Sequence, residues 1–315
     1  MSALAPRVSV VIPAYNAEAT LAETLASVQA QSDTDWEAIV VDDRSTDGTA
    51  ALLARAAASE PRLRVLAGAH RGVSAARNVG IAAARGELIA FLDADDLWRP
   101  EKLQRHVAQF ERQPALGLAF ARILFVDVDG RSTGVLSTPR VRRLRAADYL
   151  YENPACTAST LVARRAVLAE LGGFDETMRF GEDLELLLRV ACHPHWQVDG
   201  LDAVLTHYRA SPRGLSSDLE AMQAGWETLI AKVGAYAPEM VARHLNAARA
   251  VHLRYLARRA LRLGLPPSRG LQLFGRALRS HPLALLREPR RSVGTLAALC
   301  LQAATASLRP TPRHP

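Results

Sequence analysis

Short apolar runs alternate with segments of helical spacing over the first 112 residues. Runs of β-branched and other apolar residues predict buried strands, and apolar positions three or four residues apart predict helices. The predicted strands cover residues 7–13, 37–41, 63–66 and 87–92. The predicted helices cover 17–30 after a cap at Asn16, about 48–58 after a cap at Asp47, 74–84, and 100–110. Strands that alternate with helices predict a mainly parallel sheet flanked by helices, which is an α/β fold.

The pattern is less regular between residues 113 and 212. It predicts strands at 117–127, 159–162 and 203–208, a hairpin turn at 127–130, and helices at 165–171 and 182–191. After about residue 210 the apolar positions keep a helical spacing and predict no further strand. We therefore expect an α/β domain over 1–212, with halves of about 1–112 and 113–212, and a helical region over 213–315.

Composition places the chain among ordinary globular proteins. Its 315 residues are 49% hydrophobic, which is ample for a sizeable core. The three cysteines, Cys156, Cys192 and Cys300, are far apart and odd in number, so a reducing compartment is expected. No secretion signal is seen at the N-terminus, and the best apolar stretch, 292–308, is too short and too diluted for a membrane span.

Charge is unevenly distributed along the chain. Residues 211–315 hold 16 Lys or Arg against 5 Asp or Glu, whereas residues 1–210 hold 23 against 27. Arg254, Arg258 and Arg262 repeat every four residues and predict a basic helix face. Two readings remain open: a solvated face that covers the first domain, or attachment to an anionic membrane surface. Nucleic acid is disfavoured because no aromatic residues accompany the arginines.

Acidic residues follow two of the predicted strands, at the edge of a parallel sheet where ligands bind. Asp93-Ala94-Asp95-Asp96 brings together carboxylates that repel each other unless a cation or strong donors lie near. Such oxygens suit Mg²⁺ or Mn²⁺, and a metal held there can bridge two phosphates; the alternative is a solvated turn. Asp43 could accept a hydrogen bond from a base or a ribose hydroxyl, or it could serve the turn alone.

Further candidates lie in the second half of the first domain. Glu182 and Asp183 begin a predicted helix, where acids are common without any catalytic role. His207 could ligate Mn²⁺ or serve as a structural histidine, and Arg209 could pair with a phosphate.

Four segments resemble, in order and in spacing, the successive motifs of glycosyltransferase family 2. They are VSVVIPAYNAEATLAETLASVQAQ, VVDDRSTDGT, RGVSAARNVGIAAARGELIAFLDADDLW and GGFDETMRFGEDLELLLRV. The resemblance covers about residues 7–210 and implies a GT-A fold, in which a Rossmann-like sheet carries a nucleotide-binding half (1–112) and an acceptor-binding half (113–212). It also implies a UDP-, GDP- or dTDP-sugar donor and transfer with inversion.

The resemblance assigns roles residue by residue. It implies nucleotide-sugar binding by Pro13, Tyr15, Asn16, Asp43, Arg77, Asn78, Asp93, Ala94 and Asp95. Asp93 and Asp95 match a DxD pair that holds Mn²⁺ or Mg²⁺, and Asp183 matches the catalytic base. Glu182, His207 and Arg209 are weaker candidates for contacts with the acceptor or a phosphate.

The expected function is therefore transfer of a sugar from a nucleotide-diphospho-sugar to a hydroxyl acceptor, in cell-surface polysaccharide or glycolipid assembly. The expected acceptor is a sugar or a lipid-linked sugar, and the expected location is cytoplasmic or peripheral on the inner face of the membrane. A nucleotidyltransferase would normally carry a Gly-rich basic loop where this chain has Pro13-Ala14-Tyr15-Asn16. A dinucleotide-dependent oxidoreductase would need G-x-G-x-x-G there. A non-catalytic nucleotide-sugar-binding scaffold is the rival of another class.

Overall fold

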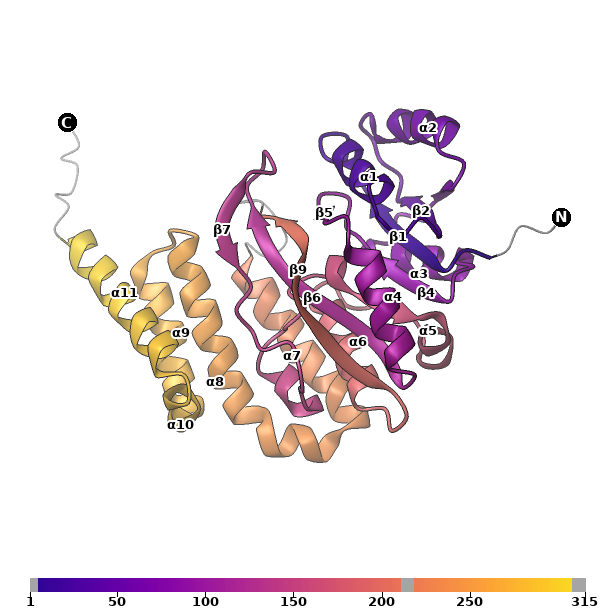
Figure 1. Ribbon diagram of the computed structural model, residues 1–315. Coiled ribbons are helices and arrows are strands. Elements are labelled where there is room, and N and C mark those ends of the chain that lie inside the picture. The colour runs from indigo at the N-terminus through magenta and orange to yellow at the C-terminus, as the bar shows by residue number, and fades with distance from the viewer. Residues whose placement is uncertain (1–4, 211–217, 308–315) are drawn as a thin grey trace, which may run out of the picture. The chain divides into compact units, whose positions relative to one another are not determined.

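The computed structural model of the chain describes residues 5–210 and 218–307 (Figure 1). Contacts divide the chain into two compact units. The first comprises Met1–Tyr149 and Asn153–Ser211, and the second comprises Leu150–Glu152 and Pro212–Pro315. The first unit is built around a sheet, and the second is built from helices.

Within the described residues, a mixed sheet of nine strands has the order β3-β2-β1-β4-β8-β6-β9-β5, with β7 paired to β6. The strands are β1 (Val8–Ala14), β2 (Trp36–Asp42), β3 (Leu63–Ala67), β4 (Leu88–Phe91), β5 (Leu97–Trp98), β6 (Leu116–Val126), β7 (Ser132–Leu136), β8 (Val162–Arg164) and β9 (Gln197–Arg209). Strands β1 to β4 run parallel to one another, as the alternating pattern predicts. The direction reverses at β8, which is antiparallel to both β4 and β6.

Helices cover both faces of the sheet. They are α1 (Leu21–Gln29), α2 (Thr49–Ser59), α3 (Val73–Ala83), α4 (Lys102–Arg112), α5 (Arg165–Leu171) and α6 (Glu182–Ala191), with 3₁₀ turns at Ala146–Leu150 and Ala158–Thr160. Side chains alternate across a strand, so Val10 and Ile12 of β1 pack in the core with α1, α2 and α4. Val11 faces α3, where a Cβ atom on Gly80 would lie 2.4 Å from its Cγ1. The missing side chain lets α3 approach β1 closely.

The predicted cap of the first helix is wrong. Helix α1 begins at Leu21, and Asn16 has a positive φ of 49°. The Asn16 side chain instead accepts a hydrogen bond from the Thr46 backbone N–H (2.7 Å), which joins the loops after β1 and β2. The prediction for Asp47 is nearer the structure, because its carboxylate accepts from the Thr49 N–H at the start of α2 (3.0 Å).

Two segments differ from the strand pattern in the second half of the sheet. The predicted strand at 159–162 is a 3₁₀ turn followed by β8, which begins at Val162. Ser159 and Thr160 are buried here: the Ser159 hydroxyl accepts from the Asp93 N–H, and the Thr160 hydroxyl donates to the Thr157 carbonyl. Because these buried residues are polar, the start of β8 could not be placed from an apolar run. The short strand β5 carries no apolar pattern of its own and pairs antiparallel with β9.

A lysine is buried beneath the sheet in α4. The Lys102 ammonium donates to the Thr160 carbonyl (3.0 Å) and lies 4.9 Å from the centre of the Trp98 ring. Burial lowers the pKa of Lys102 to about 7. Folding therefore removes a strongly hydrated charge from water at neutral pH, and this weakens the fold.

We expect Lys102→Met to raise the free energy of unfolding by about 1 to 2 kcal/mol at pH 7, since relief from desolvation outweighs the hydrogen bond lost at Thr160. Because the folded pKa lies below the unfolded one, wild-type stability rises with pH between about 7 and 10. The difference between the two proteins should therefore shrink over that range. Chemical denaturation at several pH values measures it, and a gap that stays constant contradicts this account of Lys102.

The second unit contains α7 (Leu219–Tyr236), α8 (Pro238–Arg262), α9 (Pro267–Ser280), α10 (Pro282–Leu286) and α11 (Pro289–Ser307). Arg254 of α8 is 5% exposed; it donates to Ser292 Oγ (3.1 Å) and pairs with Glu288. The regular arginine repeat of α8 is therefore not a continuous exposed face. Among the described helices, none combines the length and hydropathy that crossing a bilayer requires.

Candidate active site

The carboxyl ends of β1 and β2 form one edge of the predicted nucleotide pocket. Ala14 and Asp42 are opposite each other in the parallel register, and the Asp43 N–H donates to the Ala14 carbonyl (2.8 Å). Pro13 is buried within β1, whereas Tyr15, just after the strand, is 52% exposed. At this edge the exposed Tyr15 therefore directly follows Ala14, whose carbonyl is hydrogen-bonded to the buried Asp43.

Asp43 organises the loop between β3 and α3. Its two carboxylate oxygens accept from the backbone N–H groups of His70 (2.6 Å) and Gly72 (3.0 Å). A Cβ atom on Gly68 would lie 2.4 Å from the Asp43 carboxylate, so the loop needs glycine there. The His70 ring then lies 5.2 Å from the Tyr15 ring. Sequence reasoning missed His70, because an isolated histidine in a loop carries no pattern.

Arg77 of α3 connects two motifs that are far apart in the sequence. Its buried guanidinium donates to Asp93 (2.6 Å) after β4 and to Glu182 (2.9 Å) at the start of α6. Burial alone would lower the pKa of Arg77, but these two carboxylates raise it above its usual value. Arg77 therefore stays charged and ties the strand end that bears the DxD pair to the helix that bears the expected base.

Asn78, the neighbour of Arg77, contacts the segment upstream of α6. Its amide donates to the Phe174 carbonyl (2.8 Å) and accepts from the Phe174 N–H (2.8 Å). The amide also donates to Glu176 (3.0 Å). In this position Asn78 fixes the Gly-Gly-Phe-Asp segment.

Asp93 is held on both sides. Apart from Arg77, its carboxylate accepts from Thr157 Oγ1 (3.2 Å), and its backbone N–H donates to Ser159 Oγ (2.9 Å). Ala94 is buried, and its carbonyl accepts from the hydroxyl of Thr24 in α1 (3.0 Å). Thr157 and Ser159 escaped the sequence reasoning because nothing in a Ser/Thr loop signals which distant acid it will meet.

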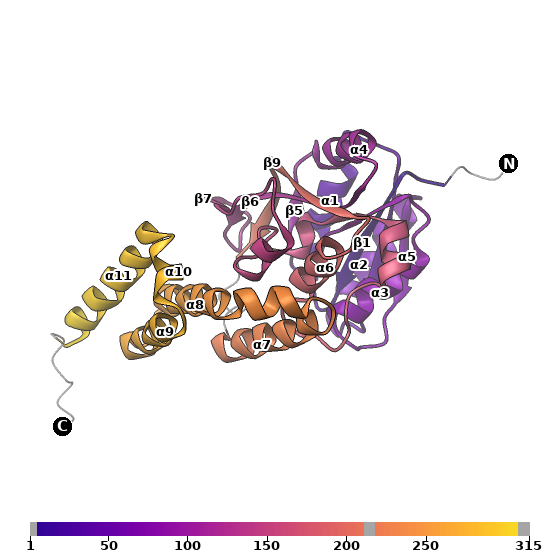
Figure 2. The same ribbon diagram turned by 90° about the horizontal axis from the view of Figure 1, so that it is seen from below.

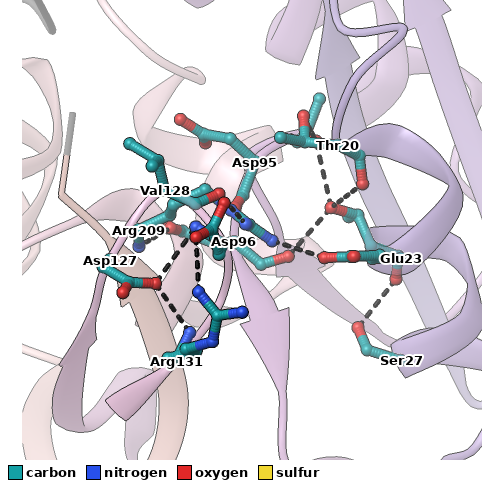
Figure 3. Close-up of polar contacts among 12 residues, drawn as sticks. Thr20, Glu23, Ser27, Asp95, Asp96, Asp127, Val128, Arg131 and Arg209 are labelled. Carbon is teal, nitrogen blue, oxygen red and sulfur yellow. Dashed lines mark hydrogen bonds and ion pairs between the residues drawn. The ribbon is translucent and has the colours of Figure 1, made fainter. Parts of the chain in front are cut away.

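Asp95 carries the exposed carboxylate of the DxD pair. Figure 3 shows it directed away from Arg209, and within the described part of the chain its side chain has no hydrogen-bond partner on another residue. Although the side chain reaches solvent, the surrounding protein displaces water from it, and this desolvation, with the charge of Asp93, raises the pKa of Asp95 to about 6. A carboxylate that is crowded by other acids and has no donor from another residue is suited to a cation.

Arg209, at the end of β9, supports Asp95 from below (Figure 3). Its guanidinium donates to the Asp95 carbonyl (2.8 Å), the Val128 carbonyl (2.6 Å) and Glu23 of α1 (2.7 Å). Its backbone N–H donates to the buried Asp96 carboxylate (2.9 Å), whose pKa burial raises well above the usual range. Arg209 is thus committed to protein groups on three elements, and in this arrangement it shapes the acidic segment.

Asp183 lies in the first turn of α6 and is buried. One carboxylate oxygen accepts from the Leu184 N–H (2.8 Å), and the other accepts from the Asn153 amide (2.8 Å). Burial, followed by the charge of Glu182, raises the pKa of Asp183 to about 6. A carboxylate with this pKa is ionised at neutral pH and is a stronger base than an exposed one. Asn153 was not predicted, since it lies 30 residues upstream in a loop.

His207 lies inside the sheet, in β9, where it is paired with Leu97 of β5 and Leu124 of β6. Its Nε2 atom is buried without a hydrogen-bond partner among the described residues, and burial lowers the pKa of the imidazole. Over residues 5–210 and 218–307, no group of three or more His, Cys, Asp or Glu side chains is arranged to hold a metal. Any metal here must therefore take part of its coordination from a ligand.

Comparison with solved structures supports the topology described above. A mannosyltransferase from Pyrobaculum calidifontis, PcManGT, solved in complex with GDP-Man and Mn²⁺, superposes with a TM-score of 0.62 at 23% identity, over 97% of this chain and 88% of that one. The likeness shows a GT-A fold, as the sequence resemblance implies.

Sequence comparison identifies relatives in bacterial polysaccharide assembly. The succinoglycan biosynthesis protein ExoO of Rhizobium meliloti is 36% identical over 218 residues, which cover 65% of this chain and 61% of ExoO. The Escherichia coli protein WfgD, a UDP-Glc:α-D-GlcNAc-diphosphoundecaprenol β-1,3-glucosyltransferase, is 37% identical over 102 residues, 32% of this chain and 40% of that protein. The chain thus spans about three-fifths of ExoO.

The family model described as glycosyl transferase family 2 matches residues 9–172. The match begins in β1, continues through Arg77 and the DxD pair, and ends just after α5. It covers more than half of the chain, and its span contains the strands that position Asp43, Asp93 and Asp95. The chain therefore belongs to glycosyl transferase family 2.

Proposed function

We propose that this chain is an inverting glycosyltransferase that moves a sugar from a nucleoside diphosphate sugar to a hydroxyl acceptor. The observation that carries the proposal is the link through Arg77, which joins Asp93 at the donor side to Glu182 beside the expected base. A nucleotide-sugar scaffold without catalysis has no need for a buried carboxylate of raised pKa next to that link. Asp183 provides one.

The donor nucleoside binds, in this proposal, at the carboxyl ends of β1 and β2. The exposed Tyr15 ring offers a flat surface beside a base, and Pro13 and Asn16 shape the loop behind it. Each Asp43 oxygen accepts one backbone N–H and retains a further lone pair for an N–H of the base. Arg77 and Asn78 hold the neighbouring segments in position.

The residues fit a divalent cation bound together with the donor. Mg²⁺ in phosphate-transfer sites is held by one or two carboxylates and completed by phosphate oxygens and water. The exposed carboxylate of Asp95 matches this need, and Asp93 lies beside it with its position fixed by Arg77. When bound, Mn²⁺ or Mg²⁺ would neutralise charge that develops on the leaving diphosphate.

Asp183 is the proposed general base. Ionised above about pH 6, it accepts the proton of the acceptor hydroxyl as that oxygen attacks the anomeric carbon. Attack from the side opposite the leaving diphosphate inverts the configuration at that carbon. Asn153 and the Leu184 N–H hold the carboxylate, which keeps it oriented without a charged partner.

The acceptor and location follow from chemistry and from relatives. The name of WfgD states a diphosphoundecaprenol-linked acceptor, and we extend a lipid-linked sugar acceptor of that kind to this chain. The corresponding process is assembly of a cell-surface polysaccharide or glycolipid. An acceptor anchored in lipid suits a protein that works on the cytoplasmic side and is peripheral to the membrane.

A donor panel tests the proposal. Purified protein is titrated with UDP-, GDP- and dTDP-sugars by calorimetry, with Mn²⁺ and after its removal by chelation, and turnover is followed as release of the nucleoside diphosphate. We expect one donor class to bind more tightly with Mn²⁺ and to be turned over in the presence of an acceptor. A donor that binds but is never cleaved with any sugar or lipid-linked acceptor favours the scaffold instead.

The pH dependence should follow Asp183. Because the base form is required and its pKa is about 6, the rate at saturating donor and metal should fall about tenfold per unit below pH 6 and level off above it. Initial rates between about pH 5 and pH 8 give this profile. The residual rate of Asp183→Asn should lack the acid limb; an identical limb in that variant assigns it to another group.

A further inference from the structure

Helix α11 has apolar residues on its outward side as well as on its inward side. Its inward side carries the core residue Leu299 (0% exposed) together with the buried polar residues Ser292 (7% exposed) and Thr295 (4% exposed). Its outward side carries Val293 (66% exposed), Leu296 (38% exposed) and Leu301 (67% exposed). The outward side of an amphipathic helix in a globular protein is normally polar. The outward side of α11 therefore has the composition of a surface that is covered by something apolar.

The exposed apolar residues form a continuous stripe. At 3.6 residues per turn, positions 293, 296, 297, 300, 301 and 304 share one side of the helix. Arg290 is on the same side at its first turn and is exposed. The preceding helix α10 adds two exposed leucines, Leu283 (66%) and Leu286 (67%). In Figures 1 and 2, α11 forms the edge of the helical unit next to α9.

The positive charge of the helical region indicates which kind of partner binds this stripe. Residues 289–315 contain four arginines and no Asp, Glu or Lys, and the region 211–315 as a whole has 16 basic against 5 acidic residues. A second copy of the chain would bring two strongly basic units together, which electrostatic repulsion opposes. An anionic lipid surface answers both features, since it offers acyl chains to the apolar stripe and phosphate groups to the arginines.

We propose that the outward face of α11, here called the α11 face and defined by Val293, Leu296, Cys300 and Leu301 with Arg290, binds the surface of an anionic lipid bilayer. The helix lies in the headgroup region with these side chains inserted and its inward side, with Leu299, packed on the bundle. The inference rests on the proposed function only for its purpose, which is to bring the chain to a lipid-linked acceptor.

Sedimentation with vesicles tests the α11 face. The full chain is mixed with vesicles of equal parts phosphatidylglycerol and phosphatidylcholine, and with vesicles of phosphatidylcholine alone. We expect binding to the first, weaker binding to the second, and loss of binding to the first at high salt. Val293→Gln with Leu301→Gln should lower the partition coefficient at least about tenfold, because each side chain contributes roughly that factor when inserted. Val135→Gln, another exposed apolar residue, is the matched control and should bind as the wild type.

A second measurement uses the native thiol on the stripe. Cys300 is exposed, whereas Cys156 and Cys192 are partly buried, so a polarity-sensitive fluorophore can be attached to Cys300. Its emission should shift to the blue when anionic vesicles are added. Unchanged emission together with unchanged sedimentation of the double variant overturns the proposal. So does a dimer in analytical ultracentrifugation that the double variant abolishes, because a second copy would then cover the face.

The proposed glycosyltransferase function and the proposed lipid binding by the α11 face can be tested independently. Donor binding is measured in the same variants without vesicles, where the double variant should bind donor as the wild type does. Loss of vesicle binding with donor binding retained is the expected result for the variant. A wild type that binds vesicles but no nucleotide sugar leaves the α11 face standing and removes the proposed function.

Discussion

Asp183→Asn is expected to lower the rate of sugar transfer about 10²- to 10⁴-fold, the usual contribution of a positioned general base. The amide cannot accept the acceptor proton, while the donor site at Asp43 and Asp95 is unchanged. Donor affinity should therefore stay within about twofold of the wild type. Transfer rates and calorimetric donor titration, both with Mn²⁺, measure the two quantities.

The substitution also alters a local contact, which the control must separate from chemistry. The introduced amide group would face the Asn153 amide, which now donates to the Asp183 carboxylate, and one of the two amides must rotate. A cost of about 1 kcal/mol in stability is expected and is read from thermal unfolding. Asp202→Asn, at an exposed acid paired with Arg122, is the matched control and should keep full activity. Wild-type transfer rates in Asp183→Asn remove this residue as the base.

Asp95→Asn is expected to abolish the strengthening of donor binding by metal, with an affinity loss of about 10- to 100-fold and a larger loss of transfer. The structure gives the reason, since the Asp95 carboxylate is exposed, crowded by Asp93 and without a hydrogen-bond partner on any other described residue. An amide is a poorer ligand for Mn²⁺ than a carboxylate. Titration of donor binding against Mn²⁺ concentration is the direct measurement.

A matched change on the neighbouring hairpin distinguishes this effect from a general loss of negative charge. Asp129→Asn removes an exposed acid that pairs with Arg131 near the same end of the sheet. Its metal dependence should equal that of the wild type. If Asp95→Asn still binds donor more tightly with Mn²⁺, to the same extent as the wild type, the DxD pair does not hold the metal.

The parallel half of the fold was predictable because its signal is local. Strands β1, β2 and β4 are buried on both faces, so apolar residues dominate them, with Ser9 and Glu37 as buried polar exceptions. Helices α5 and α6 begin and end where the sequence predicts. Gly172, with a positive φ, ends α5, and Gly181, also with a positive φ, directly precedes α6.

The rest depended on contacts between distant positions. Strand β5 consists of two residues whose only reason to be extended is the edge of β9. Thr157 reaches Asp93 across 64 positions, and Arg77 reaches Glu182 across 105. The motifs identified the acidic residues of the site. Neither periodicity nor spacing could predict that the Thr157 hydroxyl and the buried Arg77 hold those acids in position.

The Arg77 link has a consequence for redesign of this chain. A change of acceptor would be sought in the segments around α6, and a change of donor in those after β1 and β2. Because one guanidinium spans Asp93 and Glu182, a graft that moves the start of α6 also moves the first acid of the donor site. Donor and acceptor specificity can therefore be exchanged independently only if both grafts leave Glu182 in place and keep its ion pair with Arg77.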